Sequence, residues 1–172
     1  MMGILESKRL ILRPITAEDT ADILRWRNSP HVMEHFIIRV PLTEEVHRDW
    51  LENKVAKGLS EQFIIIVKDS GKAIGSQYYQ RIDREKKSAE FGIFIGEKEE
   101  TGKGYGPEVL ELAIEHARDD MGLKSIELRV IADNEAAYKL YSGHGFKVIP
   151  GSTEKKVYDG KETEILHMEL KL

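Results

Sequence analysis

Alternating hydrophobic and polar residues, and short runs of β-branched residues, fill the first half of the chain and predict β-strands. Residues 9–13 alternate and end at a proline, which cannot continue a paired strand, so a first strand is expected there. Residues 62–68 form a β-branched run, and residues 73–82 form its partner across a turn that contains Ser and Gly. A charged turn then leads to residues 88–95. The pattern predicts an antiparallel meander of three strands that continues from the first strand.

Two threonines followed by acidic residues, Thr16 and Thr43, are typical of helix N-termini. A side-chain oxygen there caps free amides, and negative charge suits that end of the helix dipole. These two helices are expected to run towards Arg27 and to Lys57, with Gly58 as the stop. From residue 96 the pattern changes, and the expected elements are a helix at 107–121, a strand at 125–131, a helix at 134–143 and strands at 146–149 and 164–170.

A strand, helix, strand order in the second half requires a crossover connection inside a mixed sheet. The predicted fold class is therefore α+β, with one domain over residues 1–172 and no repeat or linker. The central mixed sheet is expected to hold about seven strands, flanked by about four helices.

Composition narrows the function. The 172 residues are 41% hydrophobic and 33% charged, which is ordinary for a globular protein and excludes a disordered chain. A net charge of -4 argues against nucleic-acid binding, which needs a concentrated basic surface. No cysteine is present, so thiol nucleophiles, disulfides and thiolate metal ligands are excluded. No stretch approaches the roughly 18 apolar residues of a membrane span, and the start shows no export signal. A cytoplasmic protein that binds no membrane is expected.

A glycine-rich loop lies between an expected strand and an expected helix. It reads Thr101, Gly102, Lys103, Gly104, Tyr105 and Gly106. Alternating glycines let backbone amides face a bound group, and the helix behind adds its N-terminal partial charge, so an anion site is predicted. The spacing does not fit a P-loop or a dinucleotide fingerprint. The alternative interpretation is a flexible strand-to-helix connection.

Residues 90–107 and 134–146 carry two motifs, and residues 9–14 together with 88–93 carry further ones. In this order and spacing they resemble the GCN5-related N-acetyltransferase (GNAT) superfamily, and its RimJ/RimL-type branch in particular. That branch includes ribosomal-protein and spermidine acetyltransferases. The resemblance implies an enzyme that uses acetyl-CoA as co-substrate, requires no metal and acetylates a primary amine.

The resemblance also implies a role for the loop. In the superfamily a Gln/Arg-x-x-Gly-x-Gly/Ala loop binds the pyrophosphate of coenzyme A. Gly104 and Gly106 match this loop, whereas Thr101 stands where Gln or Arg is usual. The substitution removes one side-chain contact and keeps the backbone cradle. On the preceding strand, the backbone of Ile93, Phe94 and Ile95 is expected to pair with the pantetheine amides.

Two residues are candidates for the chemistry. Tyr141 lies seven residues after Asn134, so on a helix the two side chains share a face, two turns apart. The resemblance implies that Tyr141 protonates the coenzyme A thiolate and that Asn134 contacts the pantetheine arm. Glu90, on the strand that leads into the loop, can face the cleft and accept the amine proton. The alternatives are a core tyrosine and a solvent-facing strand residue.

The acceptor side is less determined. Trp26 and Trp50 could stack on a sugar, nucleobase or cation, or they could simply pack in the core. His31 and His35 have a metal-like spacing, but Pro30 precedes them and no third ligand is evident, so no metal site is expected. The remaining histidines are interpreted as surface or packing residues.

Several alternatives stay open at this point. An amino-sugar nucleotide and a polyamine rank close together as acceptors, with a protein N-terminus behind them. The expected partner is a small-molecule amine, and a homodimer is left open. The alternative function is a non-catalytic acyl-CoA-binding sensor or interaction module.

Overall fold

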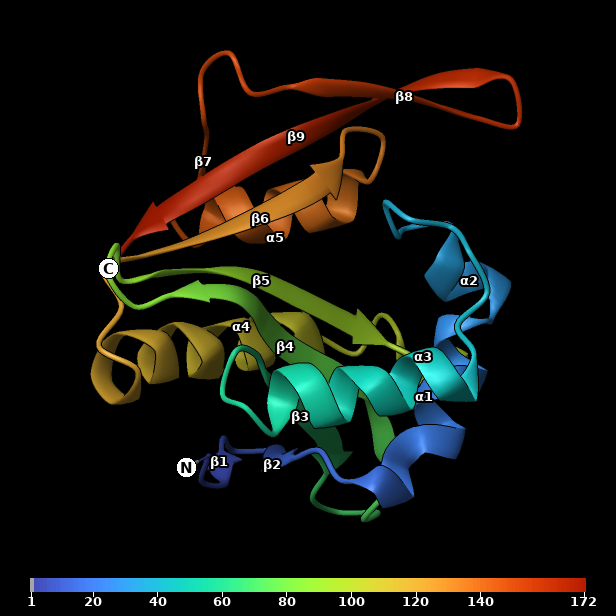
Figure 1. Ribbon diagram of the computed structural model, residues 1–172, viewed down its shortest axis with the longest axis vertical. Coiled ribbons are helices and arrows are strands. Elements are labelled where there is room, and N and C mark those ends of the chain that lie inside the picture. The colour runs from blue at the N-terminus through green and yellow to red at the C-terminus, as the bar shows by residue number, and fades with distance from the viewer. Residues whose placement is uncertain (1) are drawn as a thin grey trace.

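The computed structural model describes residues 2–172, in which nine strands form one mixed sheet with helices packed against it (Figure 1). The strands are β1 (Leu5–Glu6), β2 (Leu10–Pro14), β3 (Glu61–Val67), β4 (Ala73–Asp83), β5 (Ser88–Ile95), β6 (Ser125–Ile131), β7 (Lys147–Val148), β8 (Glu154–Tyr158) and β9 (Lys161–Lys171). The helices are α1 (Thr20–Arg27), α2 (Pro30–Met33), α3 (Glu44–Trp50), α4 (Tyr105–Glu115) and α5 (Glu135–Gly143). Strand order is β1-β2-β3-β4-β5-β6-β9-β7, with β8 paired to β9.

The seven strands and four helices expected from the sequence are all present, and the structure adds β1, β8 and α2. The four residues 154–157 of β8 are exposed, so this strand carries no buried alternating face that a pattern could reveal. It is joined to β9 by a tight turn in which Asp159 and Gly160 both have positive φ, 49° and 78°. Helix α4 begins at Tyr105, two residues earlier than expected, so Gly106 lies inside its first turn.

Caps fix where the first helices begin. The Thr16 side chain accepts a hydrogen bond from the following turn, and the Asp19 carboxylate accepts one from the Thr16 amide at 2.8 Å. Arg13 at the end of β2 donates to Asp19 at 2.8 and 2.6 Å, which joins this capped turn to the sheet. Thr43 caps α3 by accepting from the Val46 amide at 3.2 Å.

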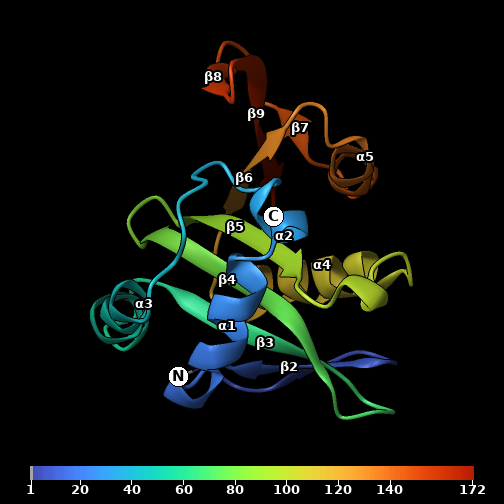
Figure 2. The same cartoon turned by 90° about the vertical axis from the view of Figure 1, so that its right-hand side faces the viewer.

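The sheet is buried on both faces, and Figure 2 shows α1 and α3 on one side of β2–β5 and α4 on the other. Phe63 and Ile65 of β3 belong to the larger core, which includes the buried face of α4. Ile64 points the other way, into a smaller core with Trp26 and Phe94. A run of consecutive apolar residues is what a strand covered on both faces requires.

The strands β5 and β6 give the fold its opening. They run parallel and pair only through Ser88–Ser125, Ala89–Ile126 and Glu90–Glu127. Beyond these pairs β5 continues to Ile95 beside β4 alone, while β6 continues beside β9. The sheet therefore divides into two halves, and the wedge between them is visible in Figure 1.

Two observations bear on partners. No helix within residues 2–172 is long and apolar enough to cross a membrane. In the same part of the chain, no group of three or more His, Asp or Glu side chains is arranged to hold a metal ion.

One buried histidine stabilises the fold on the α4 side of the sheet. His116 is only 6% exposed, with Nε2 at 2.8 Å from Glu61 and Nδ1 at 2.8 Å from Asp120. The Phe63 and Tyr79 rings pack around it. Burial alone would lower the pKa of His116, but the hydrogen bonds to Glu61 and Asp120 outweigh burial and raise it.

We expect His116 to make stability depend on pH. Because its pKa is higher in the folded state, its contribution is fully present below about pH 6.5 and is lost as the pH rises through the folded pKa. Urea unfolding between pH 6 and pH 9 should therefore show a fall in the free energy of unfolding. His116→Gln should flatten that fall, whereas His35→Gln, at an exposed position, should keep it. An equal slope in wild type and His116→Gln would contradict this role.

Candidate active site

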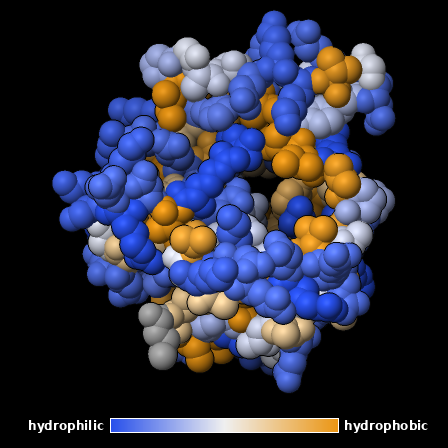
Figure 3. All heavy atoms as spheres, in the orientation of Figure 1, coloured by the Kyte–Doolittle hydropathy of each residue, from blue (hydrophilic) through white to orange (hydrophobic). Residues whose placement is uncertain are grey.

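A cavity of about 710 Å³ lies where β5 and β6 separate. Its walls come from β4, β5, β6, α5 and the segment from α1 to α3. A second cavity of about 490 Å³ lies beside the glycine-rich loop and shares Ile95, Thr101, Gly106, Ala136 and Leu140 with the first. Figure 3 shows the molecule hollowed between its two halves, with hydrophobic residues at the rim. Together the cavities run from the loop into the wedge.

Arg9 holds the glycine-rich loop. Its Nη1 donates to the Lys103 carbonyl at 2.9 Å and its Nη2 to the Gly104 carbonyl at 3.0 Å. Its Nε pairs with the Glu108 carboxylate, and its guanidinium lies over the Tyr105 ring. These bonds turn two loop carbonyls towards Arg9. The N-cap of α4 is Gly104, and no side chain within residues 2–172 caps the start of this helix. Uncapped amides at a helix N-terminus attract anions.

The glycines allow this loop conformation. Gly102 and Gly104 have φ of 75° and 77°, in the left-handed region that favours glycine. The Lys103 ammonium lies 3.0 Å from Glu100, so part of its charge is already compensated. Thr101 donates from its hydroxyl to the Lys98 carbonyl at 2.6 Å, which uses the side chain for the loop itself.

The second half of β5 offers a free edge. Ile93, Phe94 and Ile95 pair with β4 on one side and line the cavity, and β6 has left the other side. Backbone amides and carbonyls on that edge need partners. An extended chain with amide groups is a fitting partner, because it can add to the edge as a strand would.

Tyr141 and Asn134 both line the same cavity, as their helical spacing predicts. Asn134 is the N-cap of α5, and its side-chain oxygen Oδ1 accepts a hydrogen bond from the Ala137 amide at 3.3 Å. Tyr141 is 8% exposed and packs edge-on against Phe91 and Phe146. Burial, with a smaller effect of Tyr78, raises the pKa of Tyr141 well above its usual value. Its phenol therefore keeps its proton at neutral pH.

Glu90 occupies the last paired position before the strands separate. Arg129 donates to its Oε1 at 2.9 Å, and Nη1 of Arg81 lies 3.4 Å from its Oε2. Its side chain is 12% exposed and lines the cavity. A carboxylate has about four acceptor sites, so these two contacts leave room for a water or an amine.

The two tryptophans differ. Trp26 is 1% exposed, and its Nε1 donates to Glu97 at 3.0 Å, so the idea that it stacks on a substrate is wrong. A Cβ at Gly96 would lie 2.0 Å from the Trp26 ring, and glycine is therefore needed there. Trp50 lines the cavity and donates to Gln62 at 2.8 Å.

Sequence reasoning missed several cavity residues. Arg27, Tyr78 and His47 all line the cavity. His47 is 2% exposed, as a packing residue would be, but its place on the cavity wall was not predicted. His31 and His35 also line the cavity. Tyr78 lies across Gly92, where a Cβ would approach the ring to 2.1 Å. No local signal marks these residues, because tertiary packing brings them together.

The loop after α2, which lines the cavity, is held by a residue near the C-terminal end of the chain. The Tyr158 hydroxyl, next to the β8–β9 turn, donates to the Ile37 carbonyl at 2.6 Å. The Arg39 guanidinium lies 3.7 Å from the centre of the Tyr158 ring. The loop after α2 thus bridges the two halves of the sheet.

Comparison with known proteins identifies the family. Residues 9–147 match a family model described as an acetyltransferase (GNAT) domain. The chain belongs to this family. The expectation drawn from its motifs is thereby confirmed at the level of the family.

Several relatives of this GNAT chain are described as N-acetyltransferases, in agreement with the family assignment. It is 29% identical over 150 residues to the uncharacterized N-acetyltransferase p20 of Bacillus licheniformis, covering 85% of this chain and 83% of that one. It is 27% identical to the uncharacterized protein MJ1062 of Methanocaldococcus jannaschii, but spans only 31% of that longer protein. Among solved structures, spermidine N-acetyltransferase from Vibrio cholerae in complex with CoA and spermine superposes with a TM-score of 0.86 at 22% identity, over 96% of each chain. This likeness confirms the predicted fold.

Proposed function

We propose that this chain transfers the acetyl group of acetyl-CoA to a primary amine. The observation that carries the proposal is the wedge between β5 and β6. It gathers the glycine-rich loop, the free edge of β5, Glu90 and Tyr141 around connected cavities. Family membership supports acetyl transfer as the reaction.

The loop and the strand edge suit the two ends of a coenzyme A chain. The amides at the start of α4, presented by Gly104, Tyr105 and Gly106, would hold the pyrophosphate. The free edge from Ile93 to Ile95 would pair with the pantetheine amides, with Asn134 on the opposite wall. The thioester would then lie near Tyr141.

Two proton transfers accompany the reaction. The amine nitrogen bonds to the thioester carbonyl carbon, the carbon–sulfur bond breaks, the amine loses a proton and the thiolate gains one. Glu90 would accept the amine proton, directly or through a water. Tyr141, which is protonated at neutral pH, would supply the thiolate proton. The RimJ/RimL-type branch, a cytoplasmic location and a homodimer stay predictions.

Replacing Gly104 tests the cofactor site. Gly104→Val should weaken acetyl-CoA binding by at least about tenfold, because a side chain would enter the space of the pyrophosphate. Gly71→Val is the matched control: its φ of 69° imposes the same backbone strain, and it lies in the β3–β4 turn, away from the cavities. Calorimetric titration of both folded variants measures the effect. Equal affinity in the two variants would rule out the site.

Turnover tests the reaction and Tyr141 together. Free-thiol release from acetyl-CoA should require a primary amine, and Tyr141→Phe should lower it by about 100-fold or more through loss of the proton donor. Acetyl-CoA affinity should change little. Tyr138→Phe, on the exposed side of the same helix, should keep wild-type turnover. A protein that binds acetyl-CoA but releases no thiol with any amine would instead be the acyl-CoA sensor.

The pH profile tests Glu90. If Glu90 is the base, turnover at low acceptor concentration should rise with pH through an ionisation that Glu90→Gln removes. The free amine fraction also rises with pH, so two amines of different pKa are compared. An enzyme ionisation stays in place between them, whereas a substrate ionisation moves. An unchanged rate and profile in Glu90→Gln with both amines would assign the deprotonation to water.

A further inference from the structure

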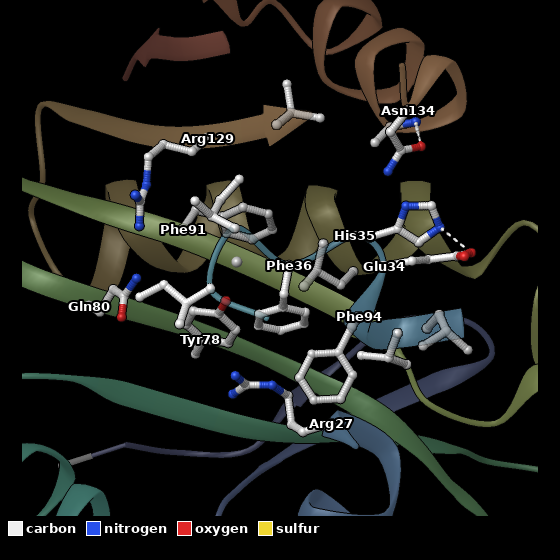
Figure 4. A pocket seen from close by; sticks show the side chains of 18 of the residues that line it. Arg27, Glu34, His35, Phe36, Tyr78, Gln80, Phe91, Phe94, Arg129 and Asn134 are labelled. Atoms are coloured by element: carbon white, nitrogen blue, oxygen red, sulfur yellow. Dashed lines mark hydrogen bonds and ion pairs between the residues drawn. The ribbon is translucent and has the colours of Figure 1, made fainter. Parts of the chain in front are cut away.

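The acceptor end of the cavity holds a positive charge without a counter-ion. Arg27, the last residue of α1, points into the cavity beneath Tyr78 (Figure 4). Its Cζ lies 3.9 Å from the centre of the Phe36 ring, so the ring covers one face of the guanidinium. Within residues 2–172 no carboxylate oxygen lies within 4.0 Å of it, and its Nε is buried without a hydrogen-bond partner. A guanidinium stacked on a ring keeps its edge free to donate.

Two imidazoles also line the cavity. His31 and His47 line it, and the Nε2 atom of each is buried without a partner in the described part of the chain. Burial, together with the positive charge of Arg27, lowers the pKa of His47. Nδ1 of His47 lies 3.2 Å from the Thr20 hydroxyl, so its Nε2 is the atom left over. Buried nitrogen atoms of this kind call for a bound partner.

Two carboxylates line the cavity, Glu90 and Glu34, and in the described part of the chain neither lies within 4.0 Å of Arg27. Glu90 contacts Arg129 and Arg81, and Glu34 lies 3.5 Å from His35 with 61% of its side chain exposed. A polyamine would bring a second cationic amine towards Arg27 and find no free carboxylate beside it. A bound oxyanion would instead pair with the guanidinium and accept from the neighbouring nitrogens.

We propose that the acceptor is an amine that also carries an oxyanion, a carboxylate or a phosphate, which Arg27 binds with help from His31 and His47. This inference rests on the proposed acetyl transfer. The reactive amine would lie towards Glu90 and the oxyanion towards Arg27. Figure 4 shows Tyr78 between Arg27 and Arg129, and Arg129 is the hydrogen-bond partner of Glu90. Arg27 is thereby a specificity residue for the acceptor and takes no part in the proton transfers.

Matched pairs of amines test the inference. O-phosphoethanolamine is compared with ethanolamine, glucosamine 6-phosphate with glucosamine, and β-alanine with propylamine; spermidine is added as the polycation. Each is titrated into the full chain saturated with coenzyme A, and each is assayed with acetyl-CoA by thiol release. At least one amine that carries an oxyanion should exceed its counterpart without the oxyanion by about tenfold or more in affinity and in kcat/KM. The three pairs distinguish phosphate from carboxylate.

Variants assign the preference to Arg27. Arg27→Met should remove the preference and raise the relative rate with spermidine, and Arg27→Lys should keep part of it, because the charge remains without the two-pronged donor. Arg118→Met removes an equal charge from an exposed residue that pairs with Asp119 and lies outside the cavity, and it should keep the wild-type preference.

The outcomes separate the two proposals. Thiol release that favours spermidine or the amines without an oxyanion would overturn the oxyanion inference and leave acetyl transfer intact. Preferential binding of an anionic amine without thiol release would do the reverse. A preference that survives Arg27→Met, or no measurable binding of any anionic amine, would overturn the inference.

Discussion

Parallel pairing between β5 and β6 lasts for three residue pairs, and the separation that follows leaves backbone groups on β5 that no neighbouring strand can satisfy. Buried backbone amides and carbonyls without hydrogen-bond partners would normally destabilise a sheet. Here they form one wall of a cavity that reaches the start of α4. The same separation places α5, carried by the other half of the sheet, opposite that wall. The connected cavities, their lining and their polar edge all follow from where this one strand pair stops.

Three arginines show how one side chain serves different purposes around the cavity. Arg9 uses its planar donors on two loop carbonyls and a carboxylate, so it is fully engaged in holding the loop. Arg129 is paired with Glu90. Arg27 is stacked on Phe36 and, among the described residues, has no ion-pair partner. An arginine keeps its charge in a protein, so Arg27 has the least compensated charge of these three arginines.

Local pattern predicts most of the fold, because β-branched runs, threonine caps and glycine stops act over a few residues. It does not reveal β8, whose exposed residues lack an apolar face, or α2, which has only four residues. For the site, motif spacing places the glycine-rich loop, Asn134 and Tyr141 beside one cavity. Motif spacing does not identify Arg9, Arg27 or His47, because their positions depend on contacts between segments that are far apart in the sequence.

The contact between Tyr158 and Ile37 joins the two half-sheets at the end opposite to their shared strand pairs. The space between the two half-sheets is therefore bridged at both ends, by the β5–β6 pairs at one end and by the Tyr158–Ile37 contact at the other. Widening the space between the half-sheets requires the loss of this contact and of the stacking of Arg39 on Tyr158. The β8–β9 hairpin, which lines neither cavity, therefore limits how far the two half-sheets can move apart.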